Sequence, residues 1–442
     1  MNKSLLALMC CGAFSSFTAQ AAPSHCIPED FGGKADAKNL NTHAIQQAIQ
    51  QCSQRGGGTV VLSPGVWLSG PIQLQSNITL EVGKGATLKA SNAEGKFVAA
   101  FIGQPARVNE AFIFASQAQN VAIIGSGTLD GDGEKSWWPE ALQIRAQVRS
   151  GNTNAFTDRF PGVPLANGAP RPWFVEFNQV TNGKIEQLHL TNSPMWNIVI
   201  RNSDKIAVHQ VSISNPTTSP NTDGLDIVSS RNVTVSKMDI HTGDDNIAIK
   251  SGLVPGTAAP SQDIAIRDSI MRDGHGISVG SETANGIGRV TVSHVTFLNT
   301  ENGIRIKSAR DRGNTIGPLV ADHLTMTNVA TPILITNSYS GQSGAQGNTL
   351  ISAIENAAVT PSTPKISGVN ISGLTATNAN HAMIFSGLPE SVVQNVSLKN
   401  IDIAAKYGIQ ARYVNGQGQD VQIKTQYGAA VEQGPQATLK LN

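Results

Sequence analysis

Short alternations of apolar and polar residues repeat along most of the chain after residue 55, separated by Asn, Gly, Asp and Ser. Alternation with a period of two predicts β-strands that bury one face. In one series, the first apolar residues are Ile185, Ile206, Val233, Ile264 and Val290, at intervals of 21, 27, 31 and 26 positions. Such a period is typical of a solenoid, in which each coil packs only on its neighbours.

A second series of strands follows the same rhythm. It begins at Leu225, Ile247, Ile277, Ile304, Ile333 and Met383, with spacings of 22, 30, 27, 29 and 50, and we interpret the last spacing as about two coils. Each coil thus supplies at least two strands with apolar inward residues and polar outward ones. We predict an all-β protein, a right-handed parallel β-helix. A β-sandwich is the alternative, but its turns come about every 8–12 residues, which leaves the longer period unexplained.

The N-terminal residues 1–21 differ from the repeat. They combine Lys3, an apolar run from Leu5 to Phe17 and the sequence Ala19-Gln20-Ala21, which predicts a secretory signal cleaved after Ala21. A lipid anchor at Cys10 or Cys11 is the less favoured reading, because the preceding Ala7-Leu8-Met9 lacks the small residue expected there. We therefore expect a secreted protein.

Two cysteines, Cys26 and Cys52, remain after this signal. In an exported protein the pair predicts one structural disulfide. Between them, Asn41–Ile49 places Ile45 and Ile49 one helical turn apart. We expect a short amphipathic helix that caps one end of the core.

The composition is typical of a protein built from strands and turns, and the net charge limits which classes of partner are plausible. The 442 residues include 43 Gly, 5% aromatic and 14% charged residues, with a net charge of +1. This charge gives no overall field for a polyanion, so nucleic acid is a poor candidate partner. No later segment approaches the roughly 20 apolar residues of a membrane span. Since no linker interrupts residues 22–442, we expect a single domain, and a monomer.

One stretch, from Asp130 to Pro172, resembles a loop inserted into the solenoid. It contains Trp137 and Trp138 and is followed by Trp173. These rings either stack on a sugar or anchor the loop by packing.

Chemically reactive side chains recur at one position of the coil. Asp223, Asp245 and His275 each lie two positions before the first inward residue of the second series, and Asp244 lies one residue earlier. Arg305 and Lys307 share one side of a later strand. The pattern predicts a groove wall that carries three carboxylates, an imidazole and two cations.

Crowded carboxylates cannot all ionise equally easily, so at least one retains a proton beside others that are ionised. Glycoside hydrolysis requires such an acid and base pair, and Arg305 and Lys307 suit an anionic sugar. Each residue also has a plainer interpretation: a turn aspartate, a calcium-binding Asp-Asp pair, a turn histidine between glycines, or a solvated pair of cations. Their common phase favours a site.

Four motifs carry a resemblance to a known family. Asn221-Thr222-Asp223-Gly224, Gly243-Asp244-Asp245, Gly274-His275-Gly276 and Arg305-Ile306-Lys307 resemble, in this order and spacing, the signature motifs of the family 28 polygalacturonases, and the longer phrases around them resemble bacterial endopolygalacturonases. The similarity is strongest from about Asn182 to Tyr339. It implies a parallel β-helix that hydrolyses α-1,4 bonds of polygalacturonate by single displacement with inversion, without metal or cofactor.

The resemblance also implies individual roles. Asp244 is the proton donor, and Asp223 and Asp245 position and deprotonate the water. His275 adjusts the protonation of the aspartates. The substrate-binding residues it implies are Arg305 and Lys307 at the sugar carboxylate, Asn221 in the cleft, and Tyr339.

Three alternatives remain open at this point. The nearest is an exo-acting enzyme with the same catalytic residues, in which the 130–172 insertion closes one end of the groove. A pectate lyase would need calcium and a basic proton acceptor. A non-catalytic polysaccharide-binding solenoid would need no catalytic residue. We favour endo-acting hydrolysis.

Overall fold

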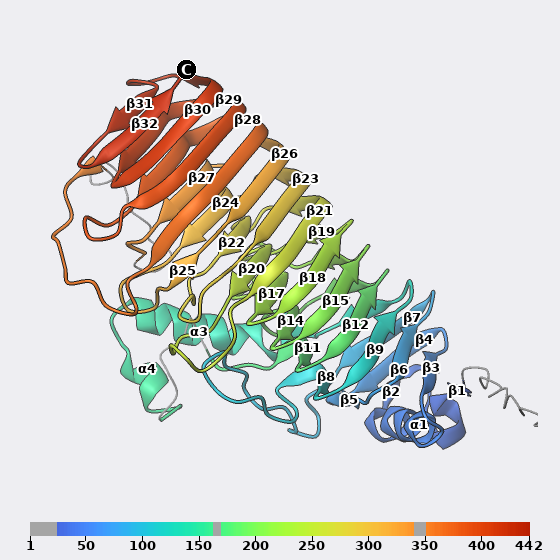
Figure 1. Cartoon of the computed structure of the whole chain (residues 1–442). Helices are drawn as coiled ribbons and strands as arrows, with labels where there is room; N and C mark the ends of the chain where they lie inside the picture. The colour runs from blue at the N-terminus through green and yellow to red at the C-terminus, as the bar shows by residue number, and fades with distance from the viewer. Residues whose placement is uncertain (1–23, 162–168, 340–350) are drawn as a thin grey trace, which may run out of the picture.

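The structure is a computed structural model that describes residues 24–161, 169–339 and 351–442; the expected signal, 1–21, lies outside these residues. The chain forms a right-handed parallel β-helix, and its coils follow one another along a single axis from the blue to the red end of Figure 1. Strands of one coil pair in parallel with those of the next. The prediction of a parallel β-helix is confirmed, and the β-sandwich is excluded.

Three columns of strands run along the axis. The first contains β1 (Ser24–Cys26), β3 (Gly58–Leu62), β6 (Ile78–Val82), β9 (Gln119–Ile124), β12 (Thr181–Glu186), β15 (Asp204–His209) and β18 (Arg231–Ser236). The second contains β2 (Asp36–Leu40), β4 (Gly65–Ser69), β7 (Ala86–Ala90), β10 (Thr128–Asp130), β13 (His189–Thr191), β16 (Ser212–Ser214) and β19 (Asp239–His241). Many strands of the second column have only three residues, which is why alternation alone did not reveal it.

The third column, called the cleft column here, carries the second series of the sequence. It contains β5 (Ile72–Leu74), β8 (Ala111–Ser116), β11 (Trp173–Asn178), β14 (Ile198–Arg201), β17 (Leu225–Val228), β20 (Ile247–Lys250), β22 (Ile277–Val279), β24 (Asn302–Lys307), β27 (Thr331–Thr336) and β31 (Val431–Gln433). In later coils the first two columns merge into β21 (Gln262–Arg272), β23 (Val290–Leu298) and β26 (Leu319–Thr327), while β28 (Lys365–Ser386) and β29 (Val393–Arg412) continue into the cleft column. The remaining strands are β25 (Thr315–Ile316), β30 (Val414–Thr425) and β32 (Ala437–Leu441).

One detail of the predicted spacing is wrong. Ile333 pairs directly with Met383, so the 50-residue interval is one coil and not about two. The extra length is a long connection between β27 and β28, part of which, 340–350, lies outside the described residues. The interval between equivalent strands includes the connecting loops, so a long loop increases the interval without adding a coil.

The corners before the first column hold their register with asparagines. Asn77, Asn120 and Asn182 have positive φ angles of 63°, 55° and 59°, a conformation that Asn tolerates better than most residues. Asn120 donates a hydrogen bond to Asn77 at 2.8 Å, and Asn182 donates one to Asn120 at 2.7 Å. This ladder joins the coils of β6, β9 and β12 and holds their first strands in register.

The N-terminal end of the core is covered by helix α1 (Thr42–Gln54), after the 3₁₀ turn η1 (Pro28–Phe31) (Figure 1). Its buried residues Ala44, Ile45, Ala48, Ile49 and Cys52 form one apolar face. A disulfide joins Cys52 to Cys26, with 6.0 Å between the Cα atoms. Both the capping helix and the disulfide were predicted.

In its described residues the inserted segment forms three helices rather than an irregular loop: α2 (Gly133–Ser136), α3 (Trp138–Arg149) and α4 (Asn154–Thr157). Trp138 is buried and donates its indole N–H to the Ser193 carbonyl at 2.9 Å. Trp137 packs edge-on against Phe97, with 5.6 Å between ring centroids. These two rings anchor the insertion by packing. None of the helices in the described residues is long and apolar enough to span a membrane.

Candidate active site

The cleft column brings the predicted residues into line. Leu225 pairs with Ile247, and Ile247 pairs with Ile277, so the residues two positions before each lie on three successive coils. These are Asp223, Asp245 and His275. The outward positions Asp226, Ala248, Ser278 and Arg305 form the neighbouring row. Because strands in adjacent coils lie about 4.8 Å apart, the two rows form one compact polar cluster.

Asp245 is neutralised by both predicted cations. Its Oδ1 accepts hydrogen bonds from Arg305 Nη2 and from Ser278 Oγ, the latter at 2.9 Å, and its Oδ2 accepts one from Lys307 Nζ at 2.9 Å. Burial alone would raise the pKa of Asp245, but the charges of Lys307 and Arg305 lower it well below its usual value. Asp245 is therefore ionised, and the two cations already have a partner before any substrate binds.

Asp244 and His275 form a second pair. Nδ1 of His275 lies 3.2 Å from Oδ1 of Asp244, and Nε2 lies 3.2 Å from a carboxylate oxygen of Glu301. Burial acts to lower the pKa of His275, but the hydrogen bond and charge of Asp244 outweigh it and raise the pKa. Burial likewise acts to raise the pKa of Asp244, and His275 lowers it. In the unliganded site this pair therefore holds its proton on the imidazole.

Asp223 belongs to a third group, with Asp226 and Lys250. Lys250 Nζ lies 2.9 Å from Asp226 Oδ1 and 3.8 Å from Asp223 Oδ2. Burial is the main reason that the pKa of Asp223 is well above its usual value, and Asp244 and Asp226 add to the rise. Burial also raises the pKa of Asp226, to about 7, against the opposing charge of Lys250. One ammonium does not keep both carboxylates ionised, so this side of the cluster retains a proton.

The other predicted residues adjoin the cluster. Asn221 has a φ of 55°, and its Oδ1 accepts a hydrogen bond from Arg171 Nη2 at 2.9 Å. Because arginine only donates, this contact orients the amide so that its NH₂ is the group of Asn221 that can donate to a ligand. Lys307 Nζ lies 5.5 Å from the ring centroid of Tyr339, and burial raises the pKa of Tyr339 to about 12. The phenol is therefore a neutral hydrogen-bonding group.

Asp244, Asp245 and His275 also bring one donor atom each within 4.8 Å of one another, a spacing that a metal ion would accept. The chemistry of these donors fits a metal poorly. Both oxygens of Asp245 are engaged by Arg305 and Lys307, whose positive charges also oppose a metal ion at the same carboxylate. The alternative of a calcium-binding Asp-Asp pair is therefore disfavoured by this arrangement.

Comparison with known proteins places this site in a family. The family model described as glycosyl hydrolases family 28 matches residues 52–424, which include every residue of the cluster. The chain belongs to glycosyl hydrolase family 28.

Proteins similar to this chain include both an endo-polygalacturonase and an exopolygalacturonase. An endo-polygalacturonase of Pectobacterium carotovorum subsp. carotovorum is 32% identical over 78% of this chain and 83% of its own length. The polygalacturonase structure from Erwinia carotovora ssp. carotovora has a TM-score of 0.68 and 28% identity, covering 89% of this chain and 96% of that one. A hyperthermoactive exopolygalacturonase from Thermotoga maritima has a TM-score of 0.74 and 25% identity, covering 92% and 93%.

The structure of this family 28 member adds residues that the sequence argument missed, namely Arg171, Trp196, Asp226, Lys250, Ser278 and Glu282. A usable signal existed for some of them. Asp226 and Ser278 occupy the strand position of Arg305 in other coils, and Lys250 follows Ile249 as Lys307 follows Ile306. The register used to align the aspartates would have found them. Trp196 lies two positions before Ile198, the partner of Leu225, so the same register places it next to Asp223. Arg171 lies in the segment before β11, and only the folded structure brings it to the site.

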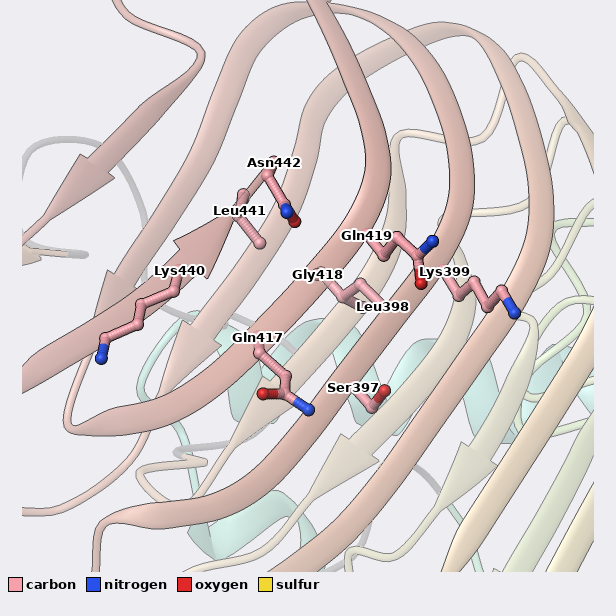
Figure 2. A pocket seen from close by; sticks show the side chains of 9 residues that line it. All are labelled: Ser397, Leu398, Lys399, Gln417, Gly418, Gln419, Lys440, Leu441 and Asn442. Carbon is pink, nitrogen blue, oxygen red and sulfur yellow. The ribbon is translucent and has the colours of Figure 1, made fainter.

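Trp173 and Trp196 pack beside the cluster. Their rings stack with 5.2 Å between centroids and 4° between planes, and Trp173 is fully buried. Trp173 is therefore a packing residue, like Trp137 and Trp138. A separate polar hollow of about 540 Å³ lies at the C-terminal end, lined by residues such as Gln417, Gln419 and Lys440 (Figure 2). It is formed by β29, β30 and β32, whereas the polar cluster lies on β17 to β24 and the loops before them.

Proposed function

We propose that the protein hydrolyses α-1,4-galacturonosidic bonds of polygalacturonate by single displacement with inversion. The observation that supports this most is the division of the carboxylates into three electrostatic states. Asp245 is ionised between two cations, Asp244 shares a proton with His275, and Asp223 has a raised pKa. Inverting hydrolysis needs an acid and a base in one cleft, and pKa values that differ between neighbouring carboxyl groups provide them.

Asp244 is the general acid. A sugar carboxylate bound nearby adds negative charge, which raises the pKa of Asp244 and favours transfer of the proton from His275 Nδ1, 3.2 Å away. The bond between the anomeric carbon and the leaving oxygen breaks, and that oxygen takes the proton from Asp244. His275 is thus the proton reserve of the acid.

Asp223 and Asp245 orient the water that attacks the anomeric carbon. Asp223 is the better proton acceptor because burial gives its ionised form the higher proton affinity. Asp245 has a low pKa and contributes a fixed negative charge and hydrogen-bond acceptors. One proton of the water passes to Asp223 as the new C–O bond forms, which leaves a hemiacetal of inverted configuration.

Arg305, Lys307, Tyr339 and Asn221 bind the substrate. Arg305 and Lys307 have donors beyond those used by Asp245, and such donors suit a galacturonate carboxylate. Asn221 offers its amide NH₂, fixed in direction by Arg171. The Tyr339 ring, next to Lys307, provides an apolar wall with a hydroxyl group.

Endo action is the mode we favour, supported by endo-polygalacturonase relatives at 32% and 33% identity. Exo action is the second candidate. It is supported by the likeness to the Thermotoga maritima exopolygalacturonase and by the α2–α4 insertion, which leads into Arg171 beside Asn221. We also propose that residues 22–442 form one catalytic domain of an exported monomer; the Cys26–Cys52 disulfide is consistent with an oxidising compartment.

The deciding experiment is the early product distribution from calcium-free polygalacturonate, resolved by chain length and by saturation of the new ends. Mixed saturated oligomers are expected for endo hydrolysis. Monogalacturonate or digalacturonate alone would establish exo action, and unsaturated ends that depend on calcium would establish a lyase. The Asp244→Asn variant is the control: it should fold and not turn over, whereas a purely polysaccharide-binding solenoid would retain its whole function with this change.

A further inference from the structure

Lys250 is a buried cation that none of the proposed catalytic steps uses. Its side chain is 6% exposed, and its ammonium group lies 3.8 Å from the ring centroid of Trp196. Trp196 stacks in turn on Trp173, whose ring lies 5.1 Å from the guanidinium of Arg201. This stack of rings holds the ammonium in place by a cation–π contact and restricts its movement.

Three carboxylates share this ammonium. Asp226 is nearest at 2.9 Å, and Asp223 and Glu282 each lie at 3.8 Å. Among the described residues, Lys250 is the one cation within 4 Å of Asp223. The charge that stabilises ionised Asp223 therefore comes from a residue that is drawn more strongly toward Asp226.

The other charged groups facing Asp223 do not replace this contact. They are Asp226 on its own strand, Asp244 and Asp245 from the loop before β20, and Arg171 from the segment before β11. The three aspartates oppose ionisation of Asp223. The guanidinium of Arg171 is engaged by Asn221 and by the carbonyls of residues 169, 194 and 220.

We propose that Lys250 is a positioning residue that keeps Asp223 available as an ionised base, and that Asp226 controls how much of the ammonium's charge reaches Asp223. This inference rests on the hydrolytic function proposed above. It assigns the base a nearby cation that is separate from the two cations that neutralise Asp245. Removal of the positive charge at Lys250 should then raise the pKa of Asp223, and removal of the negative charge at Asp226 should lower it.

The test compares the pH dependence of kcat/KM for the wild type, Lys250→Met and Asp226→Asn. The acidic limb of the profile reports the base. In Lys250→Met, which lacks the ammonium, the acidic limb should move to higher pH by about 1 unit or more, because a neighbouring opposite charge usually shifts a pKa by that amount. Without Asp226 it should move to lower pH. Lys250→Arg should return the limb toward its wild-type position.

Lys89→Met is the matched control, because Lys89 also bridges two aspartates, at 2.9 Å and 2.8 Å, but does so in the N-terminal coils. Its profile should coincide with that of the wild type. A lower plateau in both test variants without a shift, or shifts in the same direction, would show that Lys250 is only structural. Thermal unfolding of each variant identifies one that fails to fold, and Asp226→Asn then still tests the sign.

A second measurement separates this inference from the proposed function. A ¹³C NMR titration of the Asp223 carboxyl group, assigned with Asp223→Asn, follows the same pKa without substrate. Inactivity of the wild type on polygalacturonate would refute the function, while opposite shifts in the NMR titration would still support the role of Lys250. Equal titrations in all three proteins would overturn that role.

Discussion

Asp244 and Asp245 are adjacent in the chain, but their replacement by Asn should have different effects on stability. Asp245 is 2% exposed and is bound by Arg305, Lys307 and Ser278. An ion pair at 2.9 Å has a gross attraction of about 6 kcal/mol at an effective dielectric constant of about 20. Desolvation offsets part of this, and removing one member of a buried pair typically costs about 3–5 kcal/mol. Asp245→Asn should lower the free energy of unfolding by that amount.

Asp244→Asn should cost less, about 1–2 kcal/mol, because its partner His275 can release its proton once the carboxylate is gone, whereas Arg305 and Lys307 stay charged. Its Oδ1 accepts the backbone N–H of Asp245 at 2.9 Å, and an Asn oxygen can accept the same hydrogen bond. For residues 22–442 the entropy of unfolding is about 0.9 kcal/mol/K, so Tm should fall by about 3–6 °C for Asp245→Asn and by about 1–2 °C for Asp244→Asn. Both variants should lose activity, with kcat about 10²–10⁴-fold lower for Asp244→Asn.

Calorimetry at pH 7 with the two variants in one buffer measures this difference, and circular dichroism checks that both retain the β-helix. If Asp245→Asn had the same Tm as the wild type, the reasoning would be refuted, because Arg305 and Lys307 would then not need Asp245 as a counter-charge in solution. An equal fall in Tm for both variants would also refute the reasoning, because the contacts of Asp245 would then contribute no more to stability than those of Asp244.

Three further outcomes follow from the structure. Replacing Cys26 and Cys52 by Ala removes a cross-link of 26 residues in separation, which should cost about 3.5 kcal/mol in denaturant unfolding; reductant should then no longer affect the variant. The pKa of Asp226 is about 7 when folded, so the folded protein takes up a proton as the pH falls from 8 to 6 while the unfolded chain does not. Tm should therefore increase as the pH falls from 8 to 6. In the Asp226→Asn variant this increase should be smaller. A chelator should leave hydrolysis unchanged, because Arg305 and Lys307 already neutralise the site; loss of activity that calcium restores would contradict this.

The sequence predicted the coil and the position of the site because both depend on register. The structure reproduces the predicted stacking of Ile206, Val233, Ile264 and Val290 strand by strand. The first interval, from Ile185 to Ile206, is wrong by two positions: Gly183 pairs with Ile206, and Ile185 pairs with Val208, because a glycine occupies the first inward position of that strand. The same register aligned Asp223, Asp245 and His275 without coordinates. In a solenoid, residues at equal positions of consecutive coils lie side by side, so their proximity can be predicted from the repeat alone.

What the sequence did not reveal depends on contacts that do not follow the repeat. The pairing of Arg305 and Lys307 with Asp245 spans 60 and 62 residues and depends on which way three side chains turn. The approach of Arg171 to Asn221 depends on where an insertion returns to the coil. The helices of that insertion have no counterpart in other coils, so no periodicity could indicate them.

The cleft column also constrains how this protein can change over time. Its reactive groups come from consecutive coils, one or two groups from each, and each coil is held by backbone pairing to its neighbours. Duplication of one coil would therefore preserve the backbone pairing on both sides while moving every later group about 4.8 Å along the axis. Such an event between β20 and β22 would separate Asp245 from Arg305 and Lys307. The architecture can lengthen at either side of the site by whole coils, but the segment from Asp223 to Lys307 can be altered only by substitution if it is to keep its chemistry.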